Sequence, residues 1–217
     1  VVKVGQKRIQ AKFIKPTIFM VNKPKGFTCS NDDPHAERLI FELLETRHRN
    51  IRLFCAGRLD LESEGLVILT NDGKLAHRLT HPSQKVQKKY KVEINQPLEK
   101  DAFQAMLAGF EDDGDFLQLD EIRAKAGNPV GSTKLEITMG HGKKREIRLL
   151  FTTLGYDVKR LRRYQIGAFP LKGIPTRAMK KLSTKEIELL FQNPRTPHAA
   201  LEAIADSPDA APLLHED

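Results

Sequence analysis

Long apolar runs and cysteine clusters are both missing from this chain. No stretch approaches the roughly 20 consecutive apolar residues that a membrane-spanning helix needs. No signal-peptide pattern opens the sequence, because residues 1–10 carry three cations and no apolar block. The two cysteines, Cys29 and Cys55, match neither a metal-ligand spacing nor a disulfide framework. These absences predict a globular, cytoplasmic protein that works without a membrane.

Basic residues outnumber acidic ones, most clearly outside one segment at the end of the chain. The whole chain has 36 basic and 28 acidic residues and a net charge of +8. Residues 196–217 hold five of those acids and no lysine or arginine, so the rest of the chain is more basic still. A body this basic is typical of a protein that binds a polyanion such as RNA, although many soluble basic proteins bind none.

The chain is long enough for one sizeable domain with a core of its own. We expect that domain over residues 16–195. Residues 1–15 are short and basic, and are predicted to be a linker or the remnant of an N-terminal RNA-binding domain. Residues 196–217 are rich in alanine, proline and aspartate, and are expected to form an acidic, disordered tail.

Hydrophobic periodicity predicts an alternation of strands and helices. Strands are expected over 17–22, 51–55, 66–70, 89–94, 116–124, 133–139 and 158–164. Helices are expected over 35–46, 99–108 and 184–191, in a short stretch ending at 80, and in one ending at 155. The order lacks a strict strand–helix–strand rhythm, which indicates an α+β fold with a mixed, largely antiparallel sheet flanked by helices.

One polar loop between two apolar strands concentrates reactive groups. It reads GRLDLESEGL over residues 57–66 and holds Arg58 with the carboxylates Asp60, Glu62 and Glu64. Loops fixed by rigid strands often carry catalytic side chains. Spacing alone leaves a solvated acidic turn as the simpler interpretation, and a hydrolase with Asp60 and Glu64 as paired carboxylates as another.

Longer blocks of the sequence resemble a known family. GRLD at 57–60, followed by SEGLVILTNDG at 63–73, resembles the signature of pseudouridine synthases of the RsuA/RluB type, which modify ribosomal RNA. Four weaker blocks keep the family's order: NKPKG at 22–26, KYKV at 89–92, GKKREIR at 142–148, and LRR with IG at 161–167. Glu146 stands where glutamine is usual, and Leu149-Leu150 replaces a more usual Arg-Met.

The resemblance implies the pseudouridine synthase fold with a central RNA-binding cleft. It also implies isomerisation of a specific uridine to pseudouridine in ribosomal RNA, or in a ribosomal assembly intermediate, after the base has flipped out. The reaction rejoins the same base to the same ribose, so we expect no metal and no other cofactor. We expect the protein to act as a monomer.

Three residues are the catalytic candidates that the resemblance implies. Asp60 is the nucleophile or base, acting on the anomeric carbon, on the uracil ring or on the ribose 2′ proton. Tyr90 stacks on the uracil, although a strand tyrosine also packs in a core. Arg148 is expected to orient the Asp60 carboxylate through a bidentate contact, although a surface arginine also binds phosphate.

Further residues are expected to bind the RNA. Arg58 fills the space of the flipped base, holds a flanking phosphate, or forms a salt bridge with Glu62 or Glu64. Leu161 packs under the uracil or belongs to the core. The cations expected on phosphates are Lys23, Lys25, Lys89, Arg145 and Arg162, the last within a run that also holds Lys159, Arg160 and Arg163. A non-catalytic RNA-binding or ribosome-assembly module sharing the fold is the main alternative function.

Overall fold

The computed structural model of the chain describes residues 2–4, 7–9, 15–125, 127–143 and 145–194. Near the start, β1 (Val2–Val4) pairs antiparallel with β2 (Lys7–Ile9). The rest of the predicted linker, apart from residue 15, and the predicted acidic tail lie outside the described residues. Those predictions about the two ends of the chain stay predictions.

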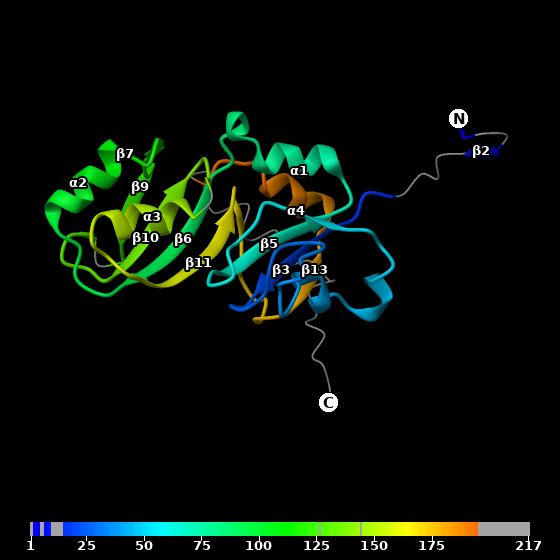
Figure 1. Cartoon of the computed structure of the whole chain (residues 1–217), viewed down its shortest axis with the longest axis horizontal. Coiled ribbons are helices and arrows are strands. Elements are labelled where there is room, and N and C mark those ends of the chain that lie inside the picture. Colours follow the sequence, from blue (N-terminus) through cyan, green and yellow to red (C-terminus); the bar gives the residue numbers. More distant parts are fainter. Residues whose placement is uncertain (1, 5–6, 10–14, 126, 144, 195–217) are drawn as a thin grey trace.

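A nine-stranded sheet forms the centre of the molecule (Figure 1). Seven strands follow in the spatial order β13, β3, β5, β11, β6, β10, β9, while β4 also pairs with β5 and β12 with β11. Their bounds are β3 (Ile18–Lys23), β4 (Phe54–Ala56), β5 (Glu64–Thr70), β6 (Lys88–Ile94), β9 (Glu121–Ala124), β10 (Lys134–Met139), β11 (Val158–Ile166), β12 (Phe169–Pro170) and β13 (Met179–Lys181). Only the β5–β11 pair is parallel. The predicted mixed, largely antiparallel sheet is confirmed.

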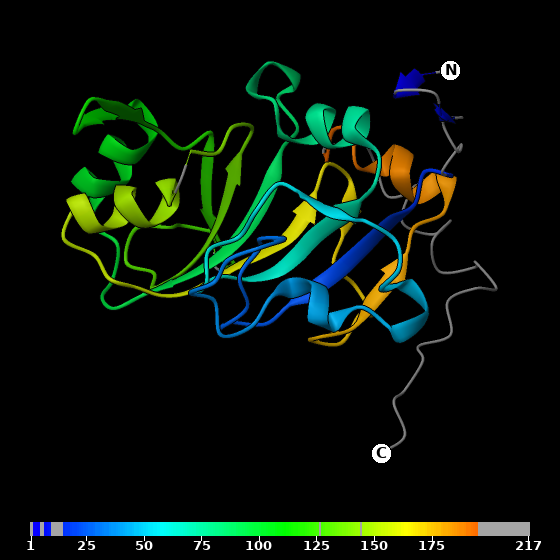
Figure 2. The same ribbon diagram turned by 45° about the vertical axis from the view of Figure 1, so that its right-hand side comes forward.

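Helices cover the two ends of this sheet (Figures 1 and 2). The helices α2 (Lys100–Ala108) and α3 (Glu146–Thr153) lie beside β6, β9 and β10, together with the small hairpin of β7 (Phe110–Asp112) and β8 (Asp115–Leu117). The helices α1 (Gly73–Thr80) and α4 (Thr184–Leu189) lie beside β3, β5 and β13. The predicted α+β architecture, a sheet flanked by helices, is therefore present.

Two hydrophobic clusters hold these elements together, and β3 and β5 contribute to both. On β3, Phe19 packs into the cluster that includes α3, whereas Met20 packs into the cluster that includes α1 and α4. On β5, Val67 packs into the first of these clusters and Ile68 into the second. Successive side chains of a strand point to opposite faces, so these continuous apolar runs bury both faces of the central strands.

The turn after β5 shows how polar side chains set the element boundaries. Asp72 caps α1, because its Oδ1 accepts hydrogen bonds from the amides of Lys74 and Leu75 at 2.9 and 3.1 Å. Asn71 accepts from the amide of Thr17 at 2.7 Å and thereby joins the end of β5 to the beginning of β3. The sequence NDG at 71–73 therefore ends one strand and starts one helix.

The predicted helix over residues 35–46 is wrong. The segment forms two short 3-10 turns, η1 (Ile40–Leu43) and η2 (Thr46–His48). Leu39 is extended, and its amide donates to the carboxylate of Glu42 at 2.7 Å. Ile40 and Leu44 are buried as expected, but a helical spacing of apolar residues can be met by short turns as well. The expected strand over 116–124 is likewise divided between β8 and β9.

The parallel junction between β5 and β11 is very short. Only Arg162 with Glu64 and Arg163 with Gly65 are in register there, because β4 pairs with the rest of the same edge of β5. Gly65 has φ of 110°, and a Cβ at this position would lie 2.1 Å from the carbonyl oxygen of Arg163. The two strands approach as closely as they do because residue 65 has no side chain.

We predict that Gly65→Ala lowers the free energy of unfolding by about 3 kcal/mol or more, because it combines a backbone clash with an unfavourable φ. Gly73→Ala is the matched control, since a Cβ there has nothing within 4 Å. The control is expected to change stability by less than about 1 kcal/mol. Urea unfolding of both variants measures the difference, and equal stabilities would contradict the close approach of β5 and β11.

Candidate active site

The loop that carries Asp60 connects β4 to β5, two strands that are neighbours in the sheet. Leu59 is buried in the hydrophobic core, whereas Asp60 is half-buried. A tight turn follows, in which the amide of Ser63 donates to the carbonyl of Asp60 at 3.0 Å. The loop is therefore anchored on the apolar side chain next to the carboxylate.

Lys23 is completely buried below this loop. Its ammonium donates to the carbonyl oxygens of Asp60, Leu61 and Ser63 at 3.1, 3.4 and 2.6 Å, and also to that of Pro24 at 3.1 Å. Burial lowers the pKa of Lys23, an effect that nearby negative groups, Asp60 among them, oppose. The predicted contact of Lys23 with phosphate is wrong, because its donors are occupied inside the protein.

Arg163 is a second buried cation and is only 4% exposed. Its Nε donates to the carbonyl of Leu66 at 2.7 Å, and its Nη1 donates to that of Arg58 at 3.4 Å. It therefore binds both ends of the loop from the neighbouring strand β11. The basic run at 159–163 was expected to face RNA as a whole, and for Arg163 this expectation is wrong.

Arg148 approaches the loop from α3. Its Nη2 donates to the carbonyl of Glu62 and its Nη1 to that of Val158, both at 3.1 Å. Burial and the like charge of Arg145 lower its pKa, while attraction to Asp60 and Glu62 opposes the shift. The predicted bidentate contact of Arg148 with the Asp60 carboxylate is absent, because both Nη atoms donate to carbonyls and no described ion pair within 4.0 Å joins the two side chains.

Together these three cations hold the backbone of the loop, and we call them the loop cradle. Lys23, Arg148 and Arg163 come from β3, α3 and β11. Between them they bind the carbonyl oxygens of residues 58, 60, 61, 62, 63 and 66. Among the described residues, the Asp60 carboxylate itself accepts no side-chain or backbone hydrogen bond. The backbone of Asp60 is thus fixed while its side chain is available to a ligand.

The candidates Tyr90 and Leu161 lie in the hydrophobic cluster that also contains Leu59. Tyr90 is 8% exposed and stands opposite Arg163 in the β6–β11 ladder, and Leu161 is 4% exposed. Their burial fits packing beneath the loop. A contact of either side chain with a uracil stays a prediction.

The other predicted RNA-binding residues are distributed around the loop. Arg58 and Arg145 are exposed, while Lys89 and Arg162 are half-buried. Lys25 is exposed, and its ammonium donates to the carbonyl of Lys159 at 3.3 Å. Contacts of these five cations with phosphates stay predictions.

Sequence reasoning selected Lys89 and missed the importance of Lys88. Lys88 lies two residues before Tyr90 on β6, so both side chains point to the same face of the sheet. Burial and the nearby charge of Arg163 lower the pKa of Lys88 to about 8. The alternation of side chains along a strand could have predicted this, because it places residue 88, and not residue 89, on the same face of the sheet as Tyr90.

Cys29 and Cys55 lie close to each other near this loop. Their side chains are hydrogen-bonded, and the sulfur of Cys29 also accepts from the backbone of Leu59. These hydrogen bonds lower the pKa of the Cys29 thiol, and the charges of Lys23 and Arg163 contribute in the same direction. Both cysteines are free, as the sequence predicted, but they pack as a pair.

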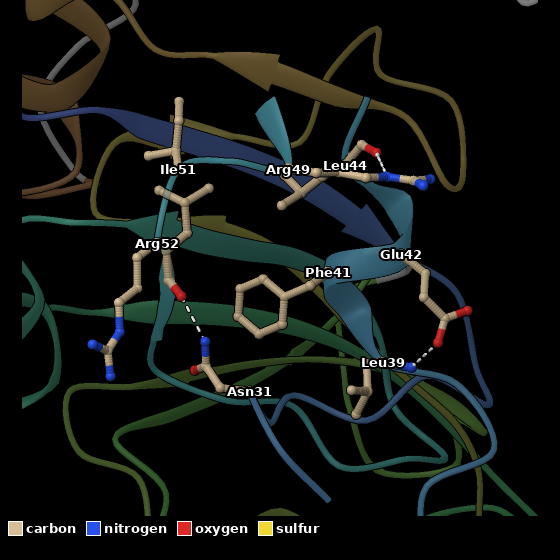
Figure 3. Close-up of a pocket in the computed structure, with 9 residues that line it drawn as sticks. Asn31, Leu39, Phe41, Glu42, Leu44, Arg49, Ile51 and Arg52 are labelled. Carbon is tan, nitrogen blue, oxygen red and sulfur yellow. Dashed lines mark hydrogen bonds between the residues drawn. The ribbon is translucent and has the colours of Figure 1, made fainter. Parts of the chain in front are cut away.

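A separate cavity of about 430 Å³ opens beside η1 and η2 (Figure 3). Phe41 lies in it, with Arg49 and Arg52 at its edges. The side-chain amide of Asn31 donates to the carbonyl of Leu53 at 2.6 Å and joins two walls of the cavity. None of the predicted site residues lines this cavity. The central RNA-binding cleft stays a prediction.

Within the part of the chain that the structure describes, no three His, Cys, Asp or Glu side chains gather as ligands for a metal ion. The same part contains no helix with the length and apolarity required to cross a bilayer. The expectation that the reaction needs no cofactor is not tested by either finding.

Comparisons with known proteins agree with the sequence motifs. The family model of RNA pseudouridylate synthases matches residues 17–153. A Mycobacterium leprae protein described as an RNA pseudouridine synthase is 35% identical over 173 residues, which cover 79% of this chain and 67% of that protein. Ribosomal small subunit pseudouridine synthase A of Escherichia coli is 31% identical over 156 residues, covering 72% of this chain and 65% of its own length.

A similar fold is known from a crystal structure of a pseudouridylate synthase. It superposes with a TM-score of 0.71 at 29% sequence identity, and the match covers 81% of this chain and 74% of the other. Sequence family, relatives and fold therefore agree, and the chain belongs to the RNA pseudouridylate synthase family.

Proposed function

We propose that this protein isomerises a specific uridine of ribosomal RNA to pseudouridine, with Asp60 as the catalytic carboxylate. The observation that carries the proposal is the loop cradle, which fixes the backbone of Asp60 and leaves the carboxylate available. The similarity to a ribosomal small subunit pseudouridine synthase supports ribosomal RNA as the substrate class. We place the catalytic domain at residues 16–195, acting as a cytoplasmic monomer without a cofactor.

The reaction requires three changes that balance within one nucleotide. The bond between the anomeric carbon and N1 breaks, the uracil turns, and a new bond forms to C5. The hydrogen on C5 leaves as a proton, and N1 gains one. The carboxylate of Asp60 attacks the anomeric carbon or the uracil ring, or removes the ribose 2′ proton, and each route needs the ionised form.

The loop cradle also brings positive charge to the loop that carries Asp60. Lys23, Arg148 and Arg163 surround the loop with positive charge, and their hydrogen bonds neutralise the negative ends of the peptide dipoles. Fixed positive groups near a reacting carboxylate stabilise it without reorganising during the reaction. Tyr90 and Leu161 belong to the hydrophobic cluster that also contains Leu59, the neighbour of Asp60 in the chain.

The hydrolase alternative is less well supported. It would use Glu64 as the second carboxylate, but Glu64 accepts from Nε of Arg160 at 2.6 Å in an ion pair across the β5–β11 junction. That partner favours a structural role. A non-catalytic RNA-binding module would need no available carboxylate, so the two remaining functions differ in what Asp60 does.

We predict that Asp60→Asn lowers the rate of pseudouridine formation by roughly 1,000-fold or more, because the reaction loses its only proposed nucleophile or base. Ribosomal RNA from cells lacking the protein is the substrate. Carbodiimide labelling with reverse-transcription stops maps the product, and release of tritium from C5-labelled uridine gives the rate.

Glu62→Gln is the control, because it removes a neighbouring, exposed carboxylate from the same loop. We expect its rate to stay within about threefold of the original protein, since exposed charges interact weakly. Full activity of Asp60→Asn, with the fold intact by circular dichroism, would contradict the proposed function.

Arg163→Met and Arg162→Met form a second test, since these neighbours on β11 differ in burial. Arg163→Met leaves two carbonyls without their donor and is expected to lower the free energy of unfolding by about 2–3 kcal/mol. Arg162→Met is expected to change stability by less than about 0.5 kcal/mol but to weaken RNA binding. Urea unfolding and filter binding separate the effects, and similar behaviour of both variants would argue against the cradle.

A further inference from the structure

Large apolar side chains are exposed at three described positions. Leu61 is 48% exposed, Phe116 is 50% exposed and Leu149 is 37% exposed. Single exposed leucines are common on protein surfaces and need no explanation. Here, however, Leu61 directly follows Asp60 and Leu149 directly follows Arg148, whereas Phe116 belongs to β8 in the small hairpin.

The backbone that carries Leu61 is held in place. Its carbonyl accepts hydrogen bonds from the amide of Gly26 at 2.9 Å and from the ammonium of Lys23 at 3.4 Å. Leu59, two residues earlier, is buried at 7% exposure, so the loop inserts one leucine into the core and presents the next to solvent. An apolar side chain on a fixed backbone can contact a ligand with little loss of conformational entropy.

A hydrogen bond links the surroundings of the two leucines. Nη2 of Arg148 donates to the carbonyl of Glu62 at 3.1 Å, so residues adjacent to Leu61 and Leu149 are in direct contact. Arg58 and Arg145, both exposed, lie within three and four residues of these leucines along the chain. Apolar groups next to the carboxylate are therefore accompanied by cations that suit a phosphate backbone.

We propose that Leu61 is an apolar wedge that packs against the nucleobases next to the extruded uridine, with Leu149 extending the same contact. This inference rests on the proposed function, because only a flipped nucleotide leaves unstacked neighbours. Apolar side chains inserted between bases replace part of the stacking that extrusion removes. The surrounding cations favour RNA over an apolar protein surface as the occupant.

The test uses single-turnover release of tritium from C5-labelled ribosomal RNA at saturating protein. Leu61→Ala is expected to slow the reaction roughly tenfold or more. Without the leucine, the free energy of unstacking the base is no longer offset and adds to the activation barrier. Leu61→Met keeps an apolar side chain and is expected to stay near the original rate. Phe116→Ala is the matched control for losing an exposed apolar group and is expected to have no effect.

A second measurement examines extrusion itself. On a short RNA that carries the mapped uridine, mismatching the bases around it is expected to restore most of the Leu61→Ala rate. If Leu61 instead contacts a partner protein, all variants will react with protein-free RNA at the same rate, and that result would overturn the wedge. If the unchanged protein releases no tritium, the proposed function fails; if it is active and Leu61→Ala equals Phe116→Ala, only the wedge fails.

Discussion

The structure depends on hydrogen bonds from two buried cations, Lys23 and Arg163, and from the half-buried Arg148 to the carbonyl oxygens of one loop. Lys23, Arg148 and Arg163 reach this loop from elements that are distant in sequence, and each donates to its backbone. A buried cation is unfavourable without hydrogen-bond partners, so burial of Lys23 and Arg163 requires β3 and β11 to lie against this loop. Formation of the sheet and formation of the active-site loop are therefore one event. Nη2 of Arg163 and Nε of Arg148 are buried without a partner among the described residues.

The same arrangement explains why the loop can be short and still position a reactive group. The cations fix the carbonyl groups of the loop by donating hydrogen bonds to them. Their donors are therefore directed to the backbone and not to the Asp60 carboxylate. The charge of Asp60 in turn raises the pKa of Lys23 and of Arg148, against the larger lowering by burial. Under the proposed function, the stability of the loop and the reactivity of Asp60 depend on the same three side chains.

Sequence reasoning identified the fold class and the family, because the motif blocks are long and keep their order. It could not assign the cations correctly, because the sequence does not distinguish a lysine that binds backbone carbonyls from one that binds phosphates. Lys23 and Arg163 were placed on RNA for this reason, and burial decides otherwise. The segment over 35–46 failed for a different reason, because spacing of apolar residues does not distinguish a helix from two short turns.

The narrow parallel junction between β5 and β11 has a mechanical consequence. Because only two residue pairs join the strands there, side chains carry much of the connection. Arg160 pairs with Glu64, and Arg163 donates to the carbonyl of Leu66. Gly65 lies at that junction, five residues after Asp60, so the catalytic candidate is close in the chain to the point where the two halves of the sheet meet.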